Sequence, residues 1–217
     1  VIQREDGIRV YTYRWNDAGT DAELLDSAGE RHFDVGGEPR VWHFPSRSEC
    51  LTCHNEAAGR FLGWKTAQLD RGVTLGAVTG SQLDLWAKLG ILGASPEPVA
   101  PYPKPDDATV SVAARARAVL DVNCATCHRP GGPPVTEHDL RYETTLAETG
   151  VCEKEPQEGS FGVAGEKLLV PGSPEQSILL LRMKTLGELR MPGGSHVVDE
   201  QAVGLVTDWI AGLPGCE

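Results

Sequence analysis

The sequence around residue 126 reads Cys124-Ala125-Thr126-Cys127-His128, which has the pattern C-x-x-C-H. In this pattern each cysteine can form a thioether bond to the same porphyrin, and the adjacent histidine can bind the iron from one face. The pattern occurs once more upstream, in Cys50-Leu51-Thr52-Cys53-His54. The sequence therefore predicts two covalently bound haem c groups, with His54 and His128 as their proximal iron ligands.

Two other kinds of site also use paired cysteines, a thioredoxin-like dithiol and a zinc site. A dithiol is expected in a βαβ unit, whereas Cys124 follows a helix predicted over residues 110–123. A zinc site could take its four ligands from both motifs, Cys50, Cys53, Cys124 and Cys127. That site would leave the histidine after each cysteine pair without a role, so we favour haem attachment at both motifs.

Composition restricts the classes of protein to consider. The 217 residues are 40% hydrophobic but only 6% aromatic, so their own side chains offer a thin core that porphyrins would fill. The formal net charge of -11 argues against nucleic-acid binding and favours a partner with a basic patch. No stretch approaches the ~18 apolar residues that a membrane-spanning helix needs, so no transmembrane segment is expected.

The compartment follows from the cofactor and the cysteines. Haem c is attached outside the cytoplasm, so we expect a periplasmic or extracellular protein. The chain opens on Val1 without a signal peptide, which indicates a mature chain or a domain of a longer protein. Four of the six cysteines belong to the motifs, which leaves Cys152 and Cys216. An even remainder in an exported protein predicts a disulfide between them, and two separate buried thiols are the alternative.

The order of elements predicts a mainly α chain with two cytochrome c-like haem domains. Residues 1–93 form the first domain, and strands predicted over 7–15 and 40–44 give it a small N-terminal β elaboration. A short helix is predicted over 81–89. Residues 94–109 contain five prolines and form an extended linker.

The second domain spans residues 110–217. Beyond the helix that leads into the motif, Ser173-Pro174-Glu175-Gln176 predicts the start of another helix. A last helix is predicted to begin after Asp199, because Val203, Val206 and Ile210 follow at helical spacing.

From 110 to 216 the chain resembles a class I cytochrome c domain: helix, C-x-x-C-H, loops, helix, Met-Pro loop and C-terminal helix. The resemblance implies that Met191, within Arg190-Met191-Pro192, is the distal ligand of the second iron. A thioether is a soft, neutral ligand that favours Fe(II), so it raises the reduction potential relative to histidine. Core filling is the plainer interpretation of a methionine, and we expect it for Met183.

The first haem has no evident distal ligand downstream, because residues 55–110 contain neither methionine nor histidine. We favour His43, since the seven residues from His43 to Cys50 can span up to ~23 Å and pass round a haem edge. A histidine packed on a strand is the plainer interpretation of His43. The other candidates are an open or water-bound iron, a tyrosine, His32, His196, Met183, Lys65, Lys88 and Lys104.

A wider resemblance rests on four further segments. They are Tyr11-Thr12-Tyr13-Arg14-Trp15-Asn16, Trp42-His43-Phe44-Pro45-Ser46-Arg47, Leu62-Gly63 and Gln68-Leu69-Asp70-Arg71. With the first motif they resemble dihaem cytochrome regions attached to, or encoded near, exported quinoprotein-type sugar dehydrogenases. The resemblance implies a carrier of single electrons between an exported oxidising enzyme, such as a quinoprotein dehydrogenase, and a downstream acceptor.

The alternative function is a small dihaem enzyme that acts at an open or labile first haem. It would be similar either to dihaem peroxidases or to thiosulfate dehydrogenases, with Cys152 or Cys216 as an iron ligand in the second case. No catalytic acid–base pair beside the first motif can be named from the sequence. An electron-transfer protein or module is therefore the preferred prediction.

Overall fold

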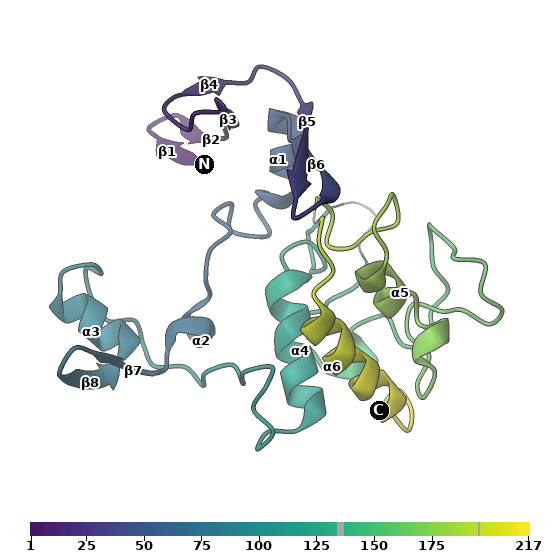
Figure 1. Ribbon diagram of the computed structural model, residues 1–217. Coiled ribbons are helices and arrows are strands. Elements are labelled where there is room, and N and C mark those ends of the chain that lie inside the picture. The colour runs from purple at the N-terminus through teal and green to yellow at the C-terminus, as the bar shows by residue number, and fades with distance from the viewer. Residues whose placement is uncertain (134–136, 195) are drawn as a thin grey trace.

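The computed structural model describes residues 1–133, 137–194 and 196–217 (Figure 1). These residues form six α-helices and four two-stranded hairpins, with 26% helix and 18% strand. The secondary structure is therefore mixed and not clearly mainly α. Two cytochrome c-like domains remain a prediction, because that statement concerns how the helices pack around a cofactor. None of the described helices is both long enough and apolar enough to cross a membrane.

Eight short strands pair as four antiparallel hairpins within the described ranges. The hairpins are β1 (Ile2–Arg4) with β2 (Gly7–Arg9), β3 (Tyr13–Trp15) with β4 (Ala22–Leu24), β5 (Gly29–Val35) with β6 (Glu38–Phe44), and β7 (Gly72–Leu75) with β8 (Val78–Ser81). The strand predicted over 40–44 lies within β6. The prediction of a single strand over 7–15 is wrong. This segment contains β2, which pairs with the preceding strand β1, and β3, which pairs with the following strand β4.

The first motif lies on α1 (Arg47–Cys53), which begins at a capping box. The Ser46 hydroxyl accepts from the backbone N–H of Glu49, and the Glu49 carboxylate accepts from the backbone N–H of Ser46 at 2.8 Å. Two short helices follow, α2 (Thr66–Leu69) and α3 (Gln82–Lys88). The helix predicted over 81–89 is thereby confirmed as α3.

The second half contains the longer helices α4 (Val112–Asn123) and α6 (Glu200–Ala211), with α5 (Ile178–Lys184) against α6. Figure 1 shows α4 and α6 side by side. Ser111 and Asp199 cap α4 and α6, so the start predicted after Asp199 is confirmed. The segment from Pro174 forms only a 3₁₀ turn (Pro174–Gln176), and α5 begins four residues later. The extended backbone of Ser177 separates the two, and its hydroxyl donates to the carbonyl of Ser173 instead.

The hydrophobic core lies almost entirely in the second half. Its fully buried large members come from α4, α5, α6 and the loop before α5: Leu120, Leu169, Leu180, Val206 and Ile210. In residues 1–93 the buried apolar side chains are Val10, Phe44, Leu83 and Leu85. The first half therefore has few apolar contacts of its own around the first motif.

The proline-rich linker runs along the protein rather than away from it. The backbone N–H of Val99 donates to the carboxylate of Asp70 at 2.9 Å, and the backbone N–H of Tyr102 donates to the carbonyl of Ala67 at 2.8 Å. At its far end Arg115, on α4, donates to the carbonyl of Pro105 at 2.8 Å. These bonds fix the linker to both halves of the chain.

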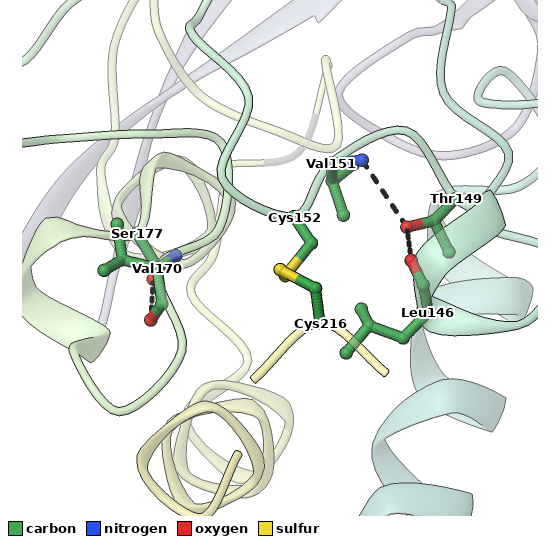
Figure 2. The surroundings of a disulfide bond; sticks show 7 residues. All are labelled: Leu146, Thr149, Val151, Cys152, Val170, Ser177 and Cys216. Atoms are coloured by element: carbon green, nitrogen blue, oxygen red, sulfur yellow. Dashed lines mark hydrogen bonds between the residues drawn. A yellow bond between two sulfur atoms is a disulfide. The ribbon is translucent and has the colours of Figure 1, made fainter. Parts of the chain in front are cut away.

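A disulfide joins Cys152 to Cys216, as the count of cysteines predicts (Figure 2). The Cα atoms are 5.7 Å apart, and 64 residues separate the two cysteines. The bond connects the loop after the second motif to the segment that follows α6. Leu146 and Val151 lie beside it, so the cross-link packs against the hydrophobic core.

Replacing both cysteines of this disulfide by alanine should lower the free energy of unfolding by about 2–4 kcal/mol. The cross-link restricts the unfolded chain, and its loss restores that conformational freedom. Urea denaturation of the exported protein with and without reductant provides the measurement. Reductant should destabilise the native protein and leave the double variant unchanged. Equal stability of native protein and variant without reductant would rule out a stabilising cross-link.

Candidate haem-binding site

The first motif presents a histidine whose ring is oriented by a backbone carbonyl. The Nδ1 atom of His54 lies 2.6 Å from the carbonyl oxygen of Arg60. Because a carbonyl can only accept, Nδ1 is the donor, which leaves Nε2 as the nitrogen that can bind a metal. Metal-binding histidines usually donate their second nitrogen in this way. The loop from Asn55 to Arg60 therefore holds His54 in the form that an iron ligand requires.

The second motif continues the C-terminal end of α4. The backbone N–H of His128 donates to the carbonyl of Cys124 at 2.9 Å, which closes one more turn. Burial lowers the pKa of His128 to about 4, with smaller effects from His138 and Arg182, so the ring is neutral at physiological pH. Its Nδ1 atom is buried and has no hydrogen-bond partner among the described residues. A neutral imidazole has a nitrogen lone pair that can bind a metal, although His128, among the described residues, lacks the second hydrogen bond that orients His54.

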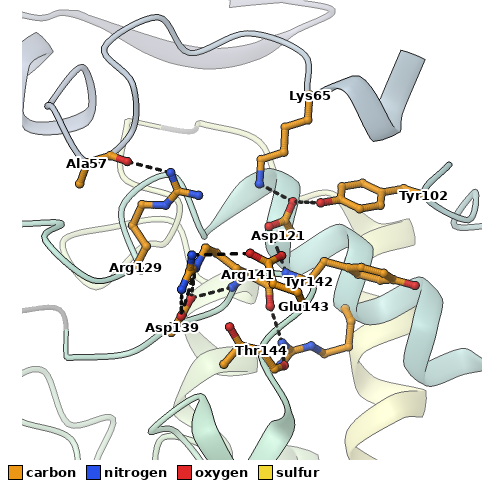
Figure 3. A network of polar contacts seen from close by, with 11 residues as sticks. Ala57, Lys65, Tyr102, Asp121, Arg129, Asp139, Arg141, Tyr142, Glu143 and Thr144 are labelled. Atoms are coloured by element: carbon orange, nitrogen blue, oxygen red, sulfur yellow. Dashed lines mark hydrogen bonds and ion pairs between the residues drawn. The ribbon is translucent and has the colours of Figure 1, made fainter. Parts of the chain in front are cut away.

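The two motifs meet although they are far apart in the sequence. The Sγ atoms of Cys53 and Cys127, 74 residues apart, lie 3.8 Å from each other. This contact lowers the pKa of Cys53 to about 6 and raises that of Cys127. Beside it the guanidinium of Arg129 donates to the carbonyl of Ala57 at 2.8 Å (Figure 3). Residues directly after each motif thus contact one another.

A buried carboxylate joins the same two halves of the chain. Asp121, on α4, is fully buried and accepts from Lys65 at 2.5 Å and from the Tyr102 hydroxyl at 2.8 Å (Figure 3). Its second oxygen accepts from the backbone N–H of Tyr142 at 3.2 Å. Burial and the neighbouring Asp121 raise the pKa of Tyr102, which therefore stays protonated and donates. Lys65, on the segment after the first motif, is engaged in this ion pair.

The sequence did not single out this network, although one signal for it is present. Asp121 is an acidic residue in the last turn of a helix, where the helix dipole disfavours negative charge. It also follows the buried Leu120 directly. An aspartate in that position needs a cationic or hydrogen-bonding partner, but the sequence does not say which residue supplies it.

The predicted distal ligands are placed as follows. His43 lies on β6 with its Nε2 atom 3.0 Å from the Glu49 carboxylate. Met191 lies in the loop before α6 with 37% of its surface exposed, while Met183 packs against the core as expected. The ring of His196 lies 5.7 Å from that of Trp42 on β6. None of these contacts tests iron ligation, so His43 and Met191 remain predictions.

The alternative sites lose support from the same geometry. Among the described residues, no group of three or more His, Cys, Asp or Glu side chains could hold a metal ion. Cys152 and Cys216 are bonded to each other, so neither offers the thiolate that a thiosulfate dehydrogenase-like iron would need.

Large apolar side chains stand exposed after the first motif and on both sides of Met191 in the sequence. Phe61 and Trp64 follow the first motif with 51% and 74% of their surface exposed. Leu186 and Val197 flank Met191 with 54% and 67% exposed. A cavity of about 590 Å³ lies between β6 and the Met191 loop, lined by Pro39, Arg40, Val41, Leu186, Arg190 and His196 among others.

Comparisons with models of protein families, with curated proteins and with solved structures found no match. The assignment of a function therefore depends on the motifs and on the geometry just described.

Proposed function

We propose that this chain is an exported dihaem c-type cytochrome that carries single electrons between an oxidising enzyme and a downstream acceptor. The observation that carries the proposal is the arrangement of the two C-x-x-C-H motifs. They lie in contact at Cys53 and Cys127, and each presents a histidine suited to bind a metal. When bound, haem c supplies a reversible one-electron change between Fe(III) and Fe(II).

In this proposal each motif holds one haem through its two cysteines. The attachment residues are Cys50 and Cys53 for the first haem and Cys124 and Cys127 for the second. His54 and His128 are the proximal ligands and Met191 the distal ligand of the second iron, while His43 is the candidate distal ligand of the first. The carbonyl of Arg60 orients His54, and burial keeps His128 neutral.

The charge and the disulfide support an exported protein with protein partners. A net charge of -11 favours encounter with a basic patch, and salt should weaken that encounter. A quinoprotein dehydrogenase is a suitable electron donor. The Cys152–Cys216 disulfide is consistent with an oxidising compartment, which we propose is the periplasm or the cell exterior.

Paired substitutions test attachment at each motif. The protein is produced by export in cells that mature c-type cytochromes, and covalent haem is counted from the mass of the intact chain. We expect two haems on the native protein, and one on each of the C50A/C53A and C124A/C127A variants. The C152A/C216A variant is the matched control and should keep both. A native protein without covalent haem would overturn the proposal.

A further inference from the structure

The loop between α5 and α6 contains a buried arginine. Arg190, directly before Met191, is only 7% exposed, although Leu186 and Val197 in the same loop are exposed. Arginine is rarely buried unless its guanidinium is bonded to other groups. We propose that Arg190 is a positioning residue, whose guanidinium closes this loop and holds Met191 in place. The inference rests on the proposed function and names the residue that supports its predicted distal ligand.

The first argument is that the guanidinium bonds to both sides of the loop. Its Nη1 atom donates to the carbonyls of Met183 and Thr185 at the end of α5, to the second at 3.2 Å. Its Nη2 atom donates to the carbonyl of Val197, shortly before α6, at 2.5 Å. One planar group therefore joins the chain before Met191 to the chain after it.

The second argument is that the C-terminal end of α5 favours a cation. The last carbonyls of a helix have no partner within the helix and carry a partial negative charge. Met183 lies in the last turn of α5, and Thr185 is its C-cap residue. A positively charged guanidinium therefore binds these carbonyls more strongly than a neutral side chain would.

The third argument is that the backbone at Met191 is anchored beside the guanidinium. The backbone N–H of Met191 donates to the carbonyl of Arg182, on α5, at 3.1 Å. The backbone N–H of Arg190 donates to the carbonyl of Gly187 at 2.9 Å. The backbone of Met191 is therefore held against α5 by its own N–H and by the residue before it, while its side chain stays partly exposed.

A fixed loop matters more for a methionine ligand than for a histidine. A thioether is a soft, neutral ligand, so it binds Fe(III) less strongly than an imidazole does. Ordering a flexible loop costs conformational entropy, and a loop that is already ordered does not incur this cost on binding. Arg190 should therefore raise the fraction of ferric protein in which Met191 is bound.

Two readouts on the full, haem-loaded chain test this role in Arg190→Gln, which is neutral and too short to bond to both sides of the loop. Hydrogen exchange followed by mass spectrometry should be roughly tenfold faster for the backbone amides around Met191, because hydrogen bonds that close the loop are lost. The weak long-wavelength iron–methionine band of the ferric protein should fall at least about twofold. Arg190→Lys keeps the charge without the planar fork, so both readouts should lie between those of native protein and Arg190→Gln.

Arg117→Gln is the matched control for a general loss of stability. Arg117, on α4, is also a buried arginine, and its Nη2 atom donates to the carbonyls of Arg141 and Thr144 at 2.7 and 2.6 Å. Its replacement should lower stability towards urea but leave exchange around Met191 and the iron–methionine band unchanged. An equal loss of the band in Arg117→Gln would reduce the effect to destabilisation and overturn the inference.

The remaining outcomes separate this inference from the proposed function. A folded Arg190→Gln variant with native exchange and a native band would overturn the positioning role and leave the cytochrome proposal intact. If Arg190→Gln does not fold, Arg190→Lys decides: a native band overturns the role and a weaker one supports it. A native protein without the band would overturn Met191 as the distal ligand, whereas the exchange readout would still show whether Arg190 holds the loop.

Discussion

Replacing Met191 by histidine should lower the reduction potential of the second haem site by on the order of 0.2 V, because axial ligands set such potentials over a wide range. A thioether stabilises Fe(II), whereas an imidazole donates more strongly and stabilises Fe(III). Met191 lies in a partly exposed loop before α6, so the polar ring can be accommodated without disturbing the core. The potential is read from a titration of the visible spectrum against electrode potential.

Met183→Leu is the control for this variant. Met183 packs on the core from α5, and leucine conserves its volume and apolar character. Its potentials should match those of the native protein. The weak long-wavelength band of an iron–methionine bond should disappear in Met191→His and persist in Met183→Leu. Retention of that band in Met191→His would exclude Met191 as the distal ligand.

Asp121→Ala should lower the free energy of unfolding by about 3–5 kcal/mol, the range for breaking a buried ion pair. The carboxylate is fully buried and accepts from Lys65, Tyr102 and the backbone N–H of Tyr142. Alanine leaves these partly buried donors without their acceptor. Urea denaturation followed by far-ultraviolet circular dichroism provides the measurement.

Glu143→Ala is the matched acidic control, since the side chain of Glu143 is 65% exposed and pairs with Arg141 at a long distance of 3.6 Å. Exposed pairs contribute little, so its stability should change by less than about 0.5 kcal/mol. If Asp121→Ala behaves like Glu143→Ala, the buried network does not hold the two halves together.

Sequence motifs predicted the features of the structure that depend on residues close together in the chain. The spacing of Cys124, Cys127 and His128 predicts an attachment site, and the cap at Asp199 marks a helix start because its side chain bonds within one turn. The disulfide was predicted because four of the six cysteines belong to the two motifs, which leaves Cys152 and Cys216 to pair with each other. These features depend on residues that are close in sequence or few in number.

The contact between the motifs could not be predicted, because it depends on pairs 56 to 74 residues apart. The C-x-x-C-H pattern says nothing about which surface faces its second copy. The run from 7 to 15 also illustrates the limit: alternating residues predict one strand, but pairing partners on both sides divide it between two hairpins. Likewise, serine and proline at 173 and 174 give only a 3₁₀ turn, because Ser177 interrupts the helix.

The most direct test of the central claim is a potentiometric titration of the exported protein, followed by its visible absorption. We predict two reversible one-electron steps with a stable half-reduced state. With His43 as its distal ligand, the site of Cys50–His54 should have the lower potential and that of Cys124–His128 the higher. Chains that bind haem but show no reversible step, or a second site that is reduced at the lower potential, would contradict the account.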